Sequence, residues 1–118
     1  MADDAALDPV VVETLRQLTP PGEPDVLAQV LNLFLQEAPK RIDRLKAAYS
    51  VGDHAEVHRA AHSLKGSVGN IGARAMFLVC RDLDEQARAG DLTKSGELVA
   101  ALAHEFARVE SEIARLLA

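Results

Sequence analysis

One segment of the sequence, residues 58–73, brings together residue types that could do chemistry. It reads HRAAHSLKGSVGNIGA and holds two histidines, one lysine and three glycines. Apolar Leu64, Val68 and Ile71 keep a helical spacing straight through the glycines. Each glycine inside a helix costs about 1 kcal/mol relative to alanine. Either the helix breaks at Gly66, or the glycines serve something outside the helix.

His62 is expected to face solvent from this helix. At about 100° per residue, its side chain points about 140° away from the centre of the apolar stripe. The residues one and two turns away on the same surface, all with almost no side chain, are Ala55, Gly66 and Gly69. Lys65 and His58 flank this patch. The spacing predicts a flat docking face around one imidazole, with a cation beside it.

Phosphoryl transfer is the chemistry that such a face suits. Imidazole is a nucleophile near neutral pH and can carry a phosphoryl group on nitrogen. Lys65 could neutralise the phosphate oxygens, and the glycine surface would let a partner bring its own metal ion and acidic residues to His62. The glycines match neither the Walker spacing nor Gly-x-Gly-x-x-Gly, so phosphorylation of the chain by itself from ATP is not expected.

Five helices are predicted to position this face. Asp8-Pro9 begins a short helix that ends before residues 19–22, because Asp caps free N–H groups and Pro suits the first turn. A second helix begins at residues 23–25, with acids in its first turn, and continues through Pro39 with a kink. The others run from Gly52-Asp53 to about Gly72, from Ala73 to Gly90-Asp91, and from about Lys94 onward.

Each predicted helix has one apolar face. In chain order these faces hold Val11, Val12, Leu15 and Leu18; Val26, Leu27, Val30, Leu31, Phe34, Leu35, Ala38, Ile42, Leu45 and Tyr49; Val57, Ala61, Leu64, Val68 and Ile71; Met76, Cys80, Leu83 and Ala87; and Leu98, Leu102, Phe106, Val109, Ile113 and Leu116. Short connections favour antiparallel neighbours. The expected fold is all-α, an antiparallel up-and-down four-helix bundle plus a short N-terminal helix. We expect a monomer with one domain over residues 1–118, of which residues 1–7 form a disordered tail.

The composition excludes several classes of protein. Only 3% of the residues are aromatic, which counts against a β-sandwich or barrel. A net charge of −5 would repel nucleic acid and anionic membranes. No apolar run approaches the ~20 residues that cross a bilayer, and the N-terminus lacks a secretory pattern. The single cysteine, Cys80, falls in an apolar stripe, so we expect an inert core residue in a cytoplasmic protein.

The motif around His62 resembles that of histidine-containing phosphotransfer (HPt) domains. It consists of residues 61–67, AHSLKGS, followed by Ile71-Gly72-Ala73. Further similarities, extending over nearly the whole chain, lie at residues 34–39, 52–53, 80–84 and 90–91. The resemblance implies a phosphocarrier rather than an enzyme. It would relay a phosphoryl group between aspartates of response-regulator receiver domains, with a hybrid sensor histidine kinase as another possible partner, through phosphohistidine at His62.

The same resemblance implies roles for the neighbours of His62. Lys65 would stabilise the phosphate, and Gly66 would admit the partner. The family often has Glu or Gln, sometimes touching the histidine, where this chain has the shorter Asp84; it commonly has a second Ser at the position of Val68, which we place in the core. The expected docking residues are Gly66, Gly69, Ala55, His58, Arg59 and Asp84. No cofactor or metal of its own is expected, and Mg²⁺ would come with the receiver.

Other interpretations stay open. A helical adaptor would bind a partner through the same face without transferring phosphate. His54, His58 and His62 recur every four residues and could form a metal stripe, although structural zinc needs four ligands. Arg41, Arg44 and Lys46 form either a solvated face or a rim for an acidic pocket. One of Phe34 and Leu35 is expected in the core and the other near the docking face, and His104 is expected in solvent.

Overall fold

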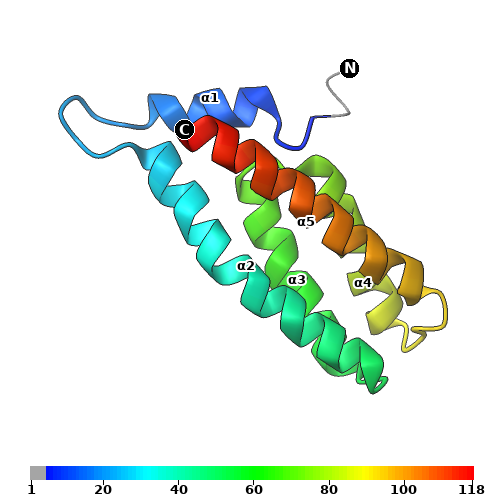
Figure 1. The fold of residues 1–118 in the computed structure, drawn as a ribbon. Coiled ribbons are helices and arrows are strands. Elements are labelled where there is room, and N and C mark those ends of the chain that lie inside the picture. The colour runs from blue at the N-terminus through cyan, green and yellow to red at the C-terminus, as the bar shows by residue number, and fades with distance from the viewer. Residues whose placement is uncertain (1–4) are drawn as a thin grey trace.

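The computed structural model describes residues 5–118, and within them it contains five helices and no strand (Figure 1). The helices are α1 (Pro9–Gln17), α2 (Val26–Ser50), α3 (His54–Asn70), α4 (Arg74–Arg88) and α5 (Ser95–Leu117). The four long helices form a bundle in which α2 packs on α3, α3 on α4 and α4 on α5, while α1 lies across one end. The predicted all-α bundle with a short N-terminal helix is confirmed.

Aspartates begin the first three helices, because a carboxylate satisfies backbone N–H groups that have no partner inside the helix. Asp8 accepts from the Val10 N–H at 2.9 Å. Asp25 accepts from the Leu27 N–H at 3.0 Å, and Asp53 caps α3 in the same way. The prediction of acids in the first turn of α2 was wrong, since Asp25 is the cap itself and no acidic residue follows it there.

Helix α2 continues without interruption through Pro39. Phe34, Ala38 and Ile42, which lie on both sides of the proline, are all buried in the core. Proline removes one hydrogen bond of the helix, and packing of the apolar face on both sides compensates for that loss. The prediction of one helix rather than two is therefore confirmed.

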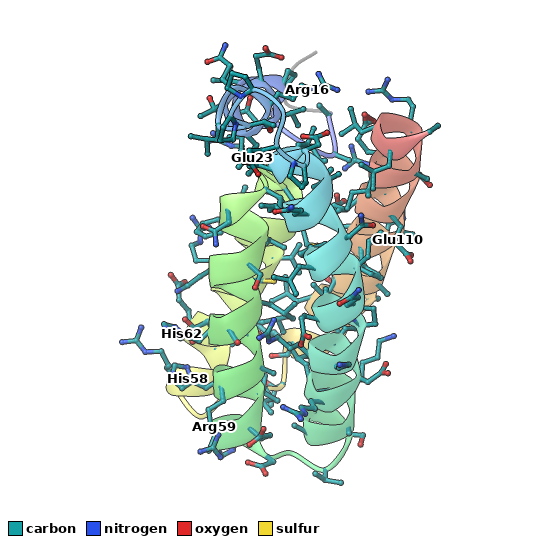
Figure 2. The ribbon with its side chains drawn as sticks, turned by 90° about the vertical axis from the view of Figure 1, so that its left-hand side faces the viewer. Arg16, Glu23, His58, Arg59, His62 and Glu110 are labelled. Carbon is teal, nitrogen blue, oxygen red and sulfur yellow. The ribbon has the colours of Figure 1, made fainter. Side chains whose placement is uncertain are left out.

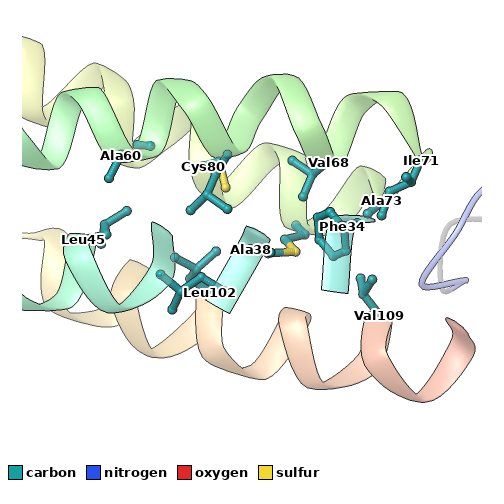
Figure 3. Close-up of a cluster of buried hydrophobic side chains, with 14 of the residues drawn as sticks. Phe34, Ala38, Leu45, Ala60, Val68, Ile71, Ala73, Cys80, Leu102 and Val109 are labelled. Atoms are coloured by element: carbon teal, nitrogen blue, oxygen red, sulfur yellow. The ribbon is translucent and has the colours of Figure 1, made fainter. Parts of the chain in front are cut away.

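The apolar faces meet in one core (Figure 3). The predicted stripes of α3 and α4 are buried throughout, from Val57 to Ile71 and from Met76 to Ala87. Val68 is fully buried, as expected from its position on the helix. Because each helix has only one apolar face, none of those within residues 5–118 is long and apolar enough to cross a membrane.

Two predictions near the N-terminus were wrong, the first of them at the described residue Leu7. Residues 1–4 of the expected disordered tail lie outside the described residues, but Leu7 is buried in the core with 3% of its surface exposed. Its neighbour Asp8 donates its backbone N–H to the Gly72 carbonyl at 2.8 Å, which fastens this segment to the α3–α4 turn. At the other end of α1, Leu18 is 60% exposed rather than packed. It follows the last residue of α1, where the helical spacing no longer applies.

Gly72 makes the turn between α3 and α4. Its φ of +73° lies in the left-handed region that favours glycine. The Gly72 N–H donates to the Gly69 carbonyl at 3.2 Å, and the Ala73 N–H donates to the Val68 carbonyl at 3.1 Å. These two bonds form a Schellman cap, which ends α3 and starts the reversal of the chain. The turn therefore sets how α4 lies beside α3.

Gly72→Ala is expected to destabilise the protein strongly. A Cβ at this position would lie 2.8 Å from the Val11 Cβ and 3.1 Å from the Asp8 Cβ, so α1 would have to shift. This clash and the strained φ should together lower the free energy of unfolding by about 2–4 kcal/mol. Urea denaturation measures the loss. Gly52→Ala is the matched control, because Gly52 has a φ of +71° with nothing within 4 Å of the added atom. Equal losses in the two variants would contradict the clash with α1.

Candidate functional site

Helix α3 carries His62 on its outer surface. The His62 side chain is 69% exposed, whereas Ala61 and Leu64 beside it are fully buried. The helix does not break at Gly66, since it runs on to Asn70. The alternative in which the helix breaks at Gly66 is therefore wrong.

Gly66 and Gly69 lie in different surroundings. A Cβ at Gly66 would meet nothing within 4 Å, so this position is open to an approaching molecule. A Cβ at Gly69 would contact the Phe77 ring of α4 at 3.7 Å, so this glycine borders a neighbouring side chain. The smooth area around His62 is therefore most open on the Gly66 side.

The remaining residues predicted on the docking face differ in how exposed their side chains are. Ala55 is exposed, and Arg59 extends into solvent beside Glu56, with which it forms an ion pair at 2.9 Å. His58 is more enclosed, with 38% of its side chain exposed. Figure 2 shows His58, Arg59 and His62 on one side of α3, away from the bundle interior.

Asp84 does not belong to the surface, and its prediction as a docking residue was wrong. Only 1% of the residue is exposed, because it lies on the side of α4 that faces α3. Its position could have been predicted, since Asp84 continues the series Met76, Cys80 at four-residue intervals and that stripe is apolar. A partner on the docking face would reach His62 without touching this carboxylate.

Asp84, on α4, lies close to three basic side chains of α3. The Lys65 Nζ donates to the Asp84 Oδ2 at 2.9 Å. The His58 Nδ1 forms a hydrogen bond with the Asp84 Oδ1. The His62 Nδ1 lies 3.9 Å from Oδ2, which is beyond a hydrogen bond but close enough for electrostatic attraction. Sequence reasoning named all four residues but missed that they form one network.

The network explains how a carboxylate is tolerated inside the bundle. Burial by itself raises the pKa of Asp84, but hydrogen bonds from Lys65 and His58, and their charges, lower it further than burial raises it. The pKa of this carboxyl therefore lies below its ordinary value, and the group is ionised at neutral pH. The ionised carboxylate in turn holds Lys65 beside His62.

Acid is expected to weaken the fold through Asp84. Its pKa is lower in the folded than in the unfolded chain, where it is about 3.9. The stabilisation is therefore complete above the unfolded value and is lost as the pH falls through the folded value. Unfolding by urea between pH 7 and pH 2.5 should show a steeper acid loss in the wild type than in Asp84→Asn. Parallel pH curves for the two proteins would contradict this assignment.

A groove of about 200 Å³ lies between α2 and α3. Its lining residues are Val30, Leu33, Phe34, Glu37, Arg41, Ser67, Asn70 and Ile71. Leu33 is 58% exposed, whereas Phe34 is buried and Leu35 packs against the core. One of Phe34 and Leu35 was expected in the core, and Phe34 does lie there. The other was expected to be exposed near the docking face, which was wrong, because the exposed apolar residue is Leu33. Of the basic cluster, Arg41 lines the groove, while Arg44 and Lys46 are exposed.

Among residues 5–118, the remaining reactive residues do not form a second centre. Cys80 is fully buried, and burial raises the pKa of its thiol to about 12, so the thiol is inert as predicted. Within residues 5–118, no three His, Cys, Asp or Glu side chains come together in a way that could hold a metal ion. His58 already uses its Nδ1 atom for Asp84, and His104 is exposed on α5.

Comparisons with known proteins agree with this geometry. The family profile described as the Hpt domain matches residues 29–112. Histidine-containing phosphotransfer proteins 5 and 2 of Arabidopsis thaliana are 34% and 31% identical to the chain over 74 residues, which is 60% of this chain. The aligned part spans about half, 47%, of each of these relatives. The crystal structure of histidine-containing phosphotransfer protein B (HptB) from Pseudomonas aeruginosa PAO1 superposes with a TM-score of 0.86 at 30% identity, covering 93% of this chain and 92% of that one.

Proposed function

This chain belongs to the Hpt domain family, and we propose that it is a phosphocarrier in a two-component phosphorelay, with His62 as the residue that carries the phosphoryl group. The observation that carries the proposal is the exposed imidazole of His62, set between the open Gly66 surface and the buried Asp84 with its half-buried partner Lys65. This arrangement offers a nucleophile, a cation and room for a partner in one place.

In the proposed step, the His62 Nε2 lone pair attacks the phosphorus of an aspartyl phosphate on a receiver domain. A nitrogen–phosphorus bond forms while the phosphorus–oxygen bond to the aspartate breaks, and the aspartate leaves as a carboxylate. The ring keeps its Nδ1 proton and becomes positively charged. The Asp84 Oδ2, 3.9 Å from that nitrogen, would stabilise this charge. The reverse step delivers the phosphoryl group to the aspartate of a second receiver.

The partner is proposed to supply most of the catalysis. The carboxylate near His62 is Asp84, which is buried and already engaged by Lys65 and His58. Mg²⁺ and the acidic residues that hold it would therefore come with the receiver, and this chain would be a carrier rather than an enzyme on its own. Lys65 would contribute donors to the phosphoryl oxygens.

The proposed docking surface is the face of α3 around Gly66, together with the α2–α3 groove. Leu33 offers exposed apolar area there, and Arg41 adds a positive charge at the groove. Exposed apolar area rimmed by polar side chains is typical of protein-binding surfaces. The partner kinds that fit are receiver domains, alone or within a hybrid sensor kinase.

We also propose that the carrier works as a monomer in the cytoplasm. The buried apolar residues of the helices already cover one another in a single core. Cys80 is a buried free cysteine, which fits a reducing compartment. Light scattering after size-exclusion chromatography checks the oligomeric state directly.

The experiment that tests the function is transfer from phosphorylated receivers to this chain, followed by intact mass. The added group should be lost in acid and stable in base, as a nitrogen–phosphorus bond is. If a panel of receivers bound the folded protein but none transferred a phosphoryl group to it, the phosphocarrier hypothesis would be wrong. The helical adaptor would then be the function that the result supports.

A further inference from the structure

Asp84 has one more basic partner than the transfer step requires. Lys65 accounts for the cation near the phosphoryl group, but His58 holds the same carboxylate from the other side. We propose that His58 is a positioning residue: by holding the Asp84 Oδ1, it leaves Lys65 able to turn its donors toward a phosphoryl group on His62. This inference rests on the proposed function and concerns the same site.

The contacts divide the carboxylate between two donors. His58 bonds to Oδ1 and Lys65 to Oδ2 at 2.9 Å, so each oxygen has one donor of its own. His62 lies nearer to the oxygen that Lys65 holds, at 3.9 Å. The rings of His58 and His62 are separated by 5.9 Å between centroids, one helical turn apart. The four groups therefore lie close together, with Asp84 buried between α3 and α4 and His62 at the surface of α3.

Charge explains why the second donor matters. A phosphoryl group on nitrogen would bring up to about two negative charges next to Asp84, as phosphorylation does elsewhere. The Asp84 side chain is 2% exposed, so water cannot compensate its charge. Without His58, Lys65 would have to satisfy both carboxylate oxygens and the phosphoryl oxygens with its three donors. With His58 present, one carboxylate oxygen is satisfied independently.

A merely structural His58 would tie α3 to α4 and nothing more. Its replacement would then lower the stability of the fold but leave the contribution of Lys65 to the phosphorylated state unchanged. A positioning role predicts coupling between the two residues, because the benefit of Lys65 depends on the donor that His58 supplies. Double substitution separates these two roles.

The test loads His62 with phosphoramidate, a small donor that needs no receiver. Its nitrogen–phosphorus bond breaks as a new one forms to the His62 Nε2, and ammonia leaves. The half-life of the phosphohistidine is then followed by intact mass at neutral pH. The variants are His58→Leu, Lys65→Ala and the two combined. His58→Asn keeps a donor at the position of Nδ1, and His104→Leu repeats the His→Leu change at an exposed position of α5.

We expect Lys65→Ala to shorten the half-life about tenfold, because a charged hydrogen bond to the phosphoryl oxygens is lost. His58→Leu should shorten it by about three- to tenfold, because Asp84 then holds the donors of Lys65. Adding Lys65→Ala to His58→Leu should shorten the half-life little further, since Lys65 no longer contributes to it in the single variant. His58→Asn should restore most of the wild-type half-life. His104→Leu should leave it unchanged.

An unchanged half-life in His58→Leu, with Lys65→Ala still effective, would overturn the inference. Additive effects in the double variant, or no rescue by His58→Asn, would overturn it as well. Failure of the proposed function looks different: receivers would give no label, while phosphoramidate still loads the imidazole and the variants are still ranked by half-life. Circular dichroism of each variant confirms that the fold is present during the assay.

Discussion

His62→Gln is expected to abolish acceptance of a phosphoryl group, to below about one thousandth of the wild-type rate, because the variant lacks the nucleophile. Glutamine keeps a polar side chain of similar length but has no nitrogen lone pair that can attack phosphorus. The measurement is intact mass of wild type and variant after incubation with a phosphorylated receiver, and separately with phosphoramidate. Neither donor should label the variant at this site.

The substitution should leave the protein otherwise intact. The His62 side chain is 69% exposed and is 3.9 Å from Asp84, so its loss removes no hydrogen bond of the core network. The free energy of unfolding should change by no more than about 0.5 kcal/mol. Binding of an unphosphorylated receiver, followed by calorimetry, should be nearly unchanged. His104→Gln is the control and should accept phosphate normally. Normal labelling of His62→Gln by a receiver would show that another residue is the acceptor.

Gly66→Leu is expected to slow transfer from a receiver by about 100-fold while leaving the fold sound, because a bulky side chain would displace the partner from the reacting nitrogen. A Cβ at this position meets nothing within 4 Å, so the added atoms point into the space that a partner would occupy. Initial rates of transfer from a phosphorylated receiver measure the effect. Phosphoramidate, which is small, should load His62 in the variant as quickly as in the wild type.

Two companion variants make this prediction specific. Gly66→Ala should raise the free energy of unfolding by up to about 1 kcal/mol, since alanine is the better helix former at an exposed position. Ala100→Leu places the same side chain at an exposed position of α5 and should transfer normally. A Gly66→Leu protein that exchanges phosphate with receivers at the wild-type rate would place the docking surface elsewhere.

The helices and the outward direction of His62 were predictable from the sequence alone. Both are consequences of local geometry, because the 3.6-residue repeat turns a list of apolar positions into a buried face and an opposite exposed one. The cap at Asp8 and the stripe from Val57 to Ile71 followed from the same local rules. The phosphotransfer hypothesis needed little more than this, together with the motif around His62.

The network under His62 depended on how the helices pack. Asp84 meets His58 and Lys65 across 26 and 19 residues of chain, and no local pattern specifies such a meeting. The turn at Gly72 sets where α4 lies on α3, and only then does the carboxylate reach the two bases. The same applies to Leu7, which is buried next to Asp8, where the Asp8 N–H bonds to the distant Gly72 carbonyl.

The sequence and the tertiary structure therefore determine different parts of the same site. Periodicity along α3 determined which imidazole faces a partner, because that depends on rotation about one helix axis. The pairing of Asp84 with Lys65 and His58 was decided by the tertiary structure, because a buried carboxylate can persist only where packing brings donors to both of its oxygens.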